Sequence, residues 1–139
     1  MKVIKNSLFI FYVKEQARSR LFYEKVLGHG PILDVPGMTE FQLSQNAVLG
    51  LMPEKGILNL LEGAIVDPSL ANGIARSELY LLVEDANIYH QRALNAGAIE
   101  LSPLKERSWG ECVAYSKDLD GHILAFGTPL NRLVKEKSC

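Results

Sequence analysis

The sequence predicts an α+β protein built from two βαβββ modules whose curved mixed sheets surround a cleft. Three observations support this fold class. A strand-like apolar run followed by an amphipathic helix occurs twice, with the copies starting 70 residues apart (Ser7 and Ser77). Each helix stops at a glycine, and short strands separated by turn residues follow each helix. A single helix covers only one face of a four-stranded sheet. Two such sheets are therefore expected to leave a cleft between their other faces.

The two helices are predicted from apolar side chains spaced three and four residues apart. The first follows the strand at residues 7–13 and stops at Gly28, and the second follows residues 77–83 and stops at Gly97. Glycine adopts the left-handed conformation that ends many helices. The predicted inner faces consist of Ala17, Leu21, Phe22 and Val26 in the first helix, and Ala86, Tyr89, Ala93 and Ala96 in the second.

Short strands with turn residues between them complete each module. In the first half they are expected at residues 31–35, 38–43 and 47–52, and in the second half at 98–101, 111–116 and 122–126. Asp120-Gly121 predicts a tight turn before the last strand. We interpret the chain as a single domain with module one at residues 1–61, a linker at 62–76, module two at 77–130 and a tail at 131–139.

Composition excludes several classes of partner. The sequence has 15 lysine and arginine residues against 16 aspartate and glutamate residues, so it lacks the basic excess of a nucleic-acid-binding protein. The apolar run near residue 8 is too short to span a membrane. Cys112 is predicted to be a small core residue and Cys139 a free thiol. Two thiols without a disulfide pattern favour a reducing, cytoplasmic compartment.

Three segments in this order resemble the vicinal-oxygen-chelate superfamily of glyoxalases, bleomycin-resistance proteins and extradiol dioxygenases. They are RLFYEKVLG at 20–28, ELYLLVEDANIYHQRALNAGA at 78–98 and WGECVAYSKDLDGHILAFGTP at 109–129, where Leu119 replaces the usual proline. The resemblance implies the fold described above. It does not select a function, because this fold serves lyases, epimerases, dioxygenases and drug-binding proteins.

The resemblance also implies positions for a divalent metal, on the first and last strands of each module. These positions carry Leu8, Glu78 and Ala125, and AVLGLM at 47–52 offers no ligand. Leucine and alanine have no donor atoms, whereas a catalytic metal needs about three protein ligands. We therefore expect no metal cofactor. An alternative is a rebuilt metal site that uses Glu40, Gln42, Glu111 or His122.

Strand alternation predicts which side chains line the cleft. If Leu8 and Glu78 face it, Phe9, Phe11, Val13, Leu79, Leu81 and Val83 pack beneath the helices. The resemblance places Trp109 near the cleft mouth. The predicted ligand-binding residues are Leu8, Ile10, Tyr12, Glu78, Tyr80, Leu82, Trp109 and Ala125. The alternatives are that these aromatic side chains fill an interior or a dimer interface, and that Glu78 is a solvated strand end.

No catalytic residue is assigned. His29, His90 and His122 are expected to be structural or exposed, with His90 on the polar side of its helix, and no nucleophile triad or nucleotide-binding motif is present. The leading hypothesis is a metal-free, homodimeric protein that binds a drug-like or amphipathic small molecule, similar to the bleomycin-resistance branch. The alternatives are a metal-dependent glyoxalase-like lyase, isomerase or dioxygenase, and a ligand-sensing partner of another protein.

Overall fold

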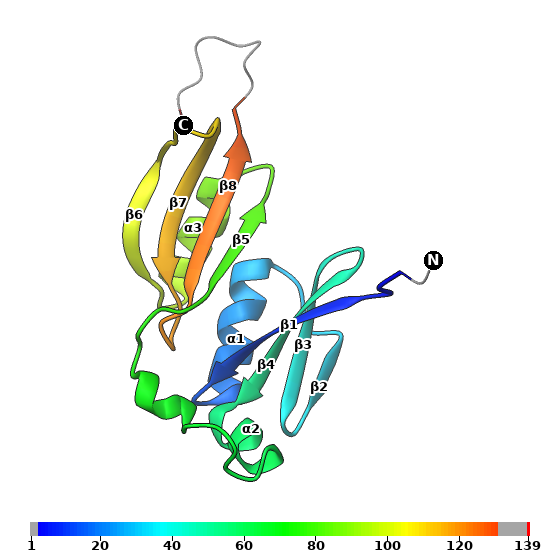
Figure 1. Cartoon of the computed structure of the whole chain (residues 1–139). Helices are drawn as coiled ribbons and strands as arrows, with labels where there is room; N and C mark the ends of the chain where they lie inside the picture. The colour runs from blue at the N-terminus through cyan, green and yellow to red at the C-terminus, as the bar shows by residue number, and fades with distance from the viewer. Residues whose placement is uncertain (1–2, 131–138) are drawn as a thin grey trace. The chain divides into compact units, whose positions relative to one another are not determined.

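The computed structural model describes residues 3–130 and 139 (Figure 1). The chain divides into two compact units, which are described separately. Unit 1 comprises residues 1–24 and 28–72, and unit 2 comprises residues 25–27 and 73–139. The module boundaries drawn from the sequence stay a prediction.

Unit 1 contains a four-stranded mixed sheet of strand order β1-β4-β3-β2. Strand β1 pairs in parallel with β4, and the other neighbours are antiparallel. The elements are β1 (Ser7–Val13), α1 (Gln16–Leu27), β2 (Leu33–Val35), β3 (Met38–Ser44), β4 (Ala47–Pro53), α2 (Glu54–Leu60) and the 3-10 helix η1 (Pro68–Ala71).

Aromatic rings join α1 to the sheet of unit 1. The ring of Tyr23 lies 4.9 Å from Phe22, 6.4 Å from Phe11 and 6.5 Å from Phe41, between ring centroids. Phe11 therefore faces the helix, and alternation places Leu8, Ile10 and Tyr12 on the opposite face, as predicted.

Three residues that were predicted to be buried against the helix or on its inner face are exposed. Phe9 was expected beneath the helix but is 56% exposed. Ala17 and Leu21 are exposed, while Ser19 is buried. Ser19, Phe22 and Tyr23 follow one helical stripe, which the apolar pattern missed because its first member is a serine.

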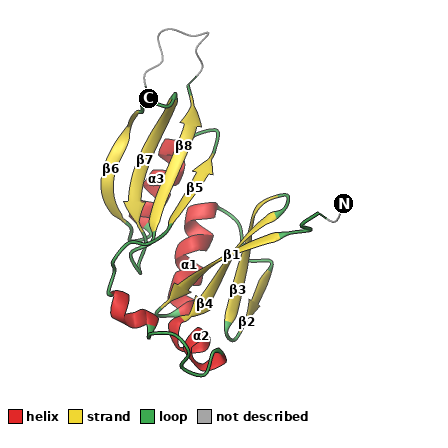
Figure 2. Ribbon diagram, viewed as in Figure 1, coloured by secondary structure: helices red, strands yellow, loops and turns green. Residues whose placement is uncertain are grey.

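Unit 2 repeats the plan with strand order β5-β8-β7-β6 and one helix, α3, on one face of the sheet (Figure 2). Strand β5 pairs in parallel with β8, whereas β6–β7 and β7–β8 are antiparallel. The elements are β5 (Glu78–Leu82), α3 (Ala86–Asn95), β6 (Ile99–Glu106), β7 (Glu111–Lys117) and β8 (Ile123–Pro129). The predicted α+β fold of two similar modules is confirmed.

The inner face of α3 carries Ala86, Ala93 and the half-buried Tyr89, whose ring lies 5.7 Å from that of Phe126. His90 belongs to the same face and is 1% exposed, so its predicted place on the polar side is wrong. Its Nε2 lies 2.8 Å from Glu100 Oε2, a contact that offsets the cost of burying the imidazole.

Most element boundaries follow the sequence closely, and the larger differences lie at α2, η1, β6 and the end of β8, which reaches Pro129. Helix α2 was not predicted, because its seven residues are too few to show a helical period. Strand β6 continues to Glu106, beyond the predicted end at Leu101, and carries two register shifts. Gly28 and Gly97 follow their helices with φ of 80° and 115°, which confirms their predicted left-handed conformation.

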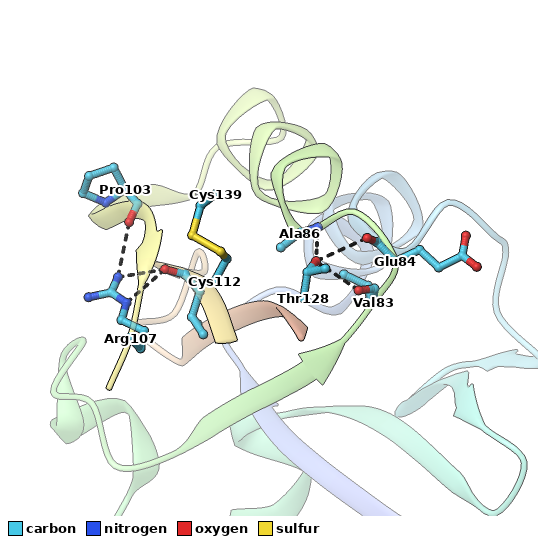
Figure 3. Close-up of a disulfide and its surroundings, with 9 residues drawn as sticks. Val83, Glu84, Ala86, Pro103, Arg107, Cys112, Thr128 and Cys139 are labelled. Carbon is cyan, nitrogen blue, oxygen red and sulfur yellow. Dashed lines mark hydrogen bonds between the residues drawn. A yellow bond between two sulfur atoms is a disulfide. The ribbon is translucent and has the colours of Figure 1, made fainter. Parts of the chain in front are cut away.

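The two cysteines form a disulfide, so the prediction that Cys112 and Cys139 are unpaired is wrong (Figure 3). Their Cα atoms are 5.5 Å apart, a normal separation for this bond. The pairing was missed because two cysteines 27 residues apart carry no recognisable spacing. The argument from free thiols to a reducing, cytoplasmic compartment loses its basis.

Candidate ligand-binding site

Unit 2 has one sheet face that α3 does not cover. Phe126 points toward α3, and its neighbour Ala125 therefore belongs to the opposite face. Tyr80 pairs with Ala125, and Glu78 and Leu82 alternate in phase with Tyr80 on the same strand. Glu111 and Tyr115 join this face from β7, because Glu111 pairs with Pro129 and Tyr115 with Ala125. The predicted phase of β5 is thus confirmed.

Tyr80 reaches from β5 across β8 toward β7. Between these strands lies Gly127, where a Cβ atom would meet Tyr80 Oη at 3.1 Å and Tyr80 Cε1 at 3.2 Å. These separations are tighter than ordinary van der Waals contact. The absence of a side chain at Gly127 therefore lets the phenol ring lie against the sheet.

Tyr80, Trp109 and Glu111, here called the Tyr80 cluster, are joined by hydrogen bonds. The Tyr80 hydroxyl donates a short hydrogen bond to Glu111 Oε1. The Trp109 indole N–H is shared between Tyr80 Oη and Glu111 Oε1, at 3.0 Å to each. A carboxylate that accepts two donors holds both aromatic side chains in defined positions.

The surroundings of Tyr80 keep its phenol protonated. Burial raises the pKa of Tyr80 above its ordinary value of 10.0, and the hydrogen bond to Glu111 raises this pKa further. The hydrogen bond from Trp109 has the opposite effect, because it stabilises the phenolate. Tyr80 is therefore a hydrogen-bond donor throughout the physiological pH range.

Tyr115 is a second phenol on this face. Burial raises its pKa, the negative charges of Glu78 and Glu111 raise it further, and the Arg107 guanidinium lowers it. Arg107 lies over the Tyr115 ring at 5.1 Å from its centroid. The same guanidinium donates to the Val113 carbonyl at 2.8 Å, which fixes it against β7. It also donates to the Pro103 carbonyl at 3.2 Å (Figure 3).

The predicted site residues fall into both units. Leu8, Ile10 and Tyr12 lie in unit 1, and their convergence with Tyr80 stays a prediction. In unit 2 the structure brings Tyr80 and Trp109 together, with Glu78, Leu82 and Ala125 on the same face of the sheet as Tyr80. Trp109 remains 53% exposed, so about half of this residue is accessible to solvent.

Glu111 was considered only as a replacement metal ligand, and its role as the acceptor in the Tyr80 cluster was missed. Its place two residues after Trp109 was a usable signal, since alternate strand residues share a face.

The rebuilt metal site does not assemble in unit 2. Glu111 starts β7, whereas His122 precedes β8 at the other end of the β7–β8 ladder. Six residues of extended strand separate these ends, about 20 Å. Within residues 3–130 and 139, no three histidine, cysteine, aspartate or glutamate side chains are grouped closely enough to hold a metal ion. The described donors therefore do not fit the divalent metal that the fold family implies, and the absence of a cofactor stays a prediction.

The other histidines have local partners. His29 is exposed, as predicted, with Nε2 2.8 Å from the Gln42 carbonyl oxygen. His122 Nδ1 lies 3.0 Å from Ser77 Oγ, and its backbone N–H donates to Asp118. These contacts support the structural role predicted for His122.

A family model for the glyoxalase-like domain matches residues 6–131. The chain belongs to the glyoxalase-like domain family. The family match and the structural neighbours place this glyoxalase-like protein in the vicinal-oxygen-chelate superfamily, which confirms the resemblance drawn from residues 20–28, 78–98 and 109–129.

Solved structures with the same fold support the assignment. A glyoxalase-related enzyme from Fulvimarina pelagi is 19% identical with a TM-score of 0.75, and the alignment covers 91% of this chain and 88% of that one. A glyoxalase/bleomycin resistance protein/dioxygenase family enzyme from Burkholderia phytofirmans PsJN is 14% identical with a TM-score of 0.73, covering 89% and 98%. At these identities the similarity establishes the fold alone.

A comparison with curated proteins gave no match. Among the residues that the structure describes, no helix has the length and hydrophobicity required to cross a membrane.

Proposed function

We propose that this glyoxalase-like protein binds a drug-like or amphipathic small molecule at the Tyr80 cluster and does so without a metal ion. The observation that carries the proposal is the pair of hydrogen bonds to Glu111 Oε1, which holds Tyr80 and Trp109 beside each other on the sheet face opposite α3. Binding sites for small molecules combine aromatic walls with a few fixed polar groups, and this cluster supplies both.

The polar atoms indicate how a ligand would be held. Both hydrogen bonds to Glu111 use Oε1, which leaves Oε2 as an acceptor for a ligand N–H or O–H group. Trp109 is partly exposed, and its indole would offer a stacking plane to a flat ligand. Glu78 adds a second, exposed carboxylate to the same face, suited to a cationic substituent. A flat organic molecule with a donor or amine substituent matches these groups.

Calorimetry with two probes tests the proposal. Bleomycin and the amphipathic dye anilinonaphthalene sulfonate are titrated into protein treated with a chelator and verified as metal-free by elemental analysis. We expect saturable binding of at least one probe, weakened by Trp109→Ala and unchanged by Tyr89→Phe, a control in α3, which packs on the opposite face of the same sheet. Equal affinity of the Trp109→Ala variant would reject the site.

The competing reading is a metal-dependent lyase, isomerase or dioxygenase, which family membership favours. Elemental analysis after gentle purification distinguishes the two. We expect no stoichiometric zinc, nickel, manganese or iron, because Leu8 and Ala125 occupy two of the family metal positions. One tightly held ion per chain would support the enzyme instead.

We also propose that the chain forms a homodimer. Strand β1 is an edge strand of its sheet and exposes Phe9, and such an edge is a surface that proteins commonly cover. Sedimentation at micromolar concentration tests this. A single species near 15.4 kDa, the mass of one chain, would contradict it.

A further inference from the structure

We propose that Cys139 is a thiol-exchange site, through which glutathione-class thiols and disulfides regulate the Tyr80 cluster. The regulatory consequence rests on the proposed ligand-binding function, whereas the exchange itself does not. The disulfide joins two residues of very unequal exposure, Cys112 buried in a strand and Cys139 exposed.

Access determines which sulfur a thiol attacks. Cys112 lies within β7, pairs with Glu106 on one side and Thr128 on the other, and is 6% exposed. Cys139 is exposed. Thiol–disulfide exchange requires an approach to one sulfur along the S–S bond, so an external thiolate reaches Cys139 Sγ more readily.

Two exchange steps then reduce the bond. A glutathione thiolate attacks Cys139 Sγ, forms a mixed disulfide with Cys139 and expels Cys112 as a thiolate, which takes up a proton. A second glutathione thiolate attacks the glutathione sulfur of this mixed disulfide. It releases the Cys139 thiolate and forms oxidised glutathione. Two electrons pass from two glutathione molecules to the protein disulfide, and oxidised glutathione reverses the sequence.

The bond lies beside the Tyr80 cluster along the backbone. Cys112 directly follows Glu111, whose carbonyl accepts the Arg107 N–H at 2.8 Å. On the other side Glu111 pairs with Pro129, and the Leu130 N–H donates to the Gly110 carbonyl at 3.0 Å. The end of β8 thus lies beside the segment that contains Trp109 and Glu111.

The strand partner of Cys112 on β8 is hydrogen-bonded to the segment between β5 and α3. Thr128, its partner on β8, donates to the Val83 carbonyl at 3.1 Å and accepts the Ala86 N–H at 2.9 Å (Figure 3). These bonds hold β8 to the start of α3. The disulfide adds a covalent bond at Cys112 in this end of β7, and reduction leaves backbone hydrogen bonds to hold Pro129 and Leu130 beside Gly110 and Glu111.

The oxidised state is therefore expected to restrain Trp109, and the reduced state to loosen it. This loosening lowers the affinity for a ligand that needs Tyr80, Trp109 and Glu111 in fixed positions. Part of the binding free energy is then used to order these side chains. The restraint acts through neighbouring backbone and requires no contact between the disulfide and the ligand.

Redox titration of the full chain tests the exchange. The protein is equilibrated in glutathione buffers of graded oxidised-to-reduced ratio, and mass spectrometry follows the disulfide and the mixed disulfide. Acrylamide quenching of Trp109, the single tryptophan, reports its accessibility. We expect glutathione on Cys139 and not on Cys112 at intermediate ratios, and stronger quenching once the bond is reduced. Glutathione found on Cys112, or no reduction at any ratio, overturns the proposal.

Binding of anilinonaphthalene sulfonate and bleomycin to both states tests the regulatory step. Reduction should weaken binding by roughly fivefold or more, the lower end of coupling between linked sites. Cys139→Ser should bind like the reduced protein in every buffer. Equal affinity of the oxidised and reduced states would overturn the regulation. Failure of both probes to bind the oxidised protein would instead refute the proposed function, while the mass and quenching data still decide the exchange.

Discussion

The phenol of Tyr80 lies against Gly127 so closely that a Cβ on residue 127 would stand 3.1 Å from the Tyr80 hydroxyl oxygen. This contact lets a side chain from β5 cross β8 and reach Glu111 on β7. The geometry of the Tyr80 cluster therefore depends on a residue that has no side chain of its own.

Gly127→Ala should displace Tyr80 from Glu111 and destabilise the protein by about 1–3 kcal/mol, the usual cost of overpacking. Urea unfolding measures the change. Since the clash involves the Tyr80 ring, the same substitution should cost much less in a Tyr80→Ala background. Equal costs in the two backgrounds would show that the loss has another origin.

Alkaline pH should weaken the fold through Tyr80 and Tyr115. Their folded pKa values are raised above the unfolded value, mainly by burial, so the neutral phenols contribute stability that is complete below about pH 10. As pH rises beyond that value the unfolded chain loses its phenol protons first, and the free energy of unfolding falls.

Urea unfolding at about pH 9 and about pH 11 tests this linkage, because the two values lie on either side of the ordinary tyrosine pKa. Tyr80→Phe should reduce the loss of stability between them. Tyr89→Phe keeps both phenols of the site and should retain the full loss. A Tyr80→Phe variant with the same pH dependence as the parent protein would contradict the assigned cause.

Cys139→Ser should lower the free energy of unfolding. A crosslink over 27 residues is expected to stabilise by about 3–4 kcal/mol, because it restricts the unfolded chain. Unfolding of oxidised parent and variant measures the difference. In excess reductant the two proteins should unfold alike, and a difference that persists there would assign the effect to the serine and not to the crosslink.

Trp109→Ala should weaken binding of a probe by about 1–3 kcal/mol if the indole is an anchor of the site. Glu78→Gln should weaken binding of a cationic probe such as bleomycin, and it should not weaken the anionic dye anilinonaphthalene sulfonate, because the Glu78 charge attracts the cation and repels the anion. Calorimetry of both probes checks this. A loss of the same size for both would remove the electrostatic role given to Glu78.

Local patterns were sufficient to predict much of the fold. Alternation along β5 correctly placed Glu78, Tyr80 and Leu82 on one face, because a strand has a period of two. The glycines after α1 and α3 marked the helix ends, because only glycine adopts that backbone without strain. The burial of His90 and Ser19 was not predictable in this way, since a helical stripe reveals its face through apolar residues.

The central contacts of the site depend on distant pairing. Tyr80 and Glu111 are 31 residues apart and meet only when the register of β5, β8 and β7 is known and Gly127 is recognised as the crossing point. Cys112 and Cys139 likewise required three-dimensional geometry. Neither pairing follows from composition or periodicity.

The single tryptophan gives the most direct test of the central claim, that a small molecule binds at the Tyr80 cluster without metal. In a ¹⁵N-labelled, chelator-treated sample, Trp109 contributes the only indole N–H resonance, and this N–H is the donor to Tyr80 and Glu111. Titration with bleomycin or anilinonaphthalene sulfonate should shift this resonance saturably, with the affinity that calorimetry gives. An unmoved indole resonance under saturating probe, or binding that begins only after a divalent metal is added, would contradict the account.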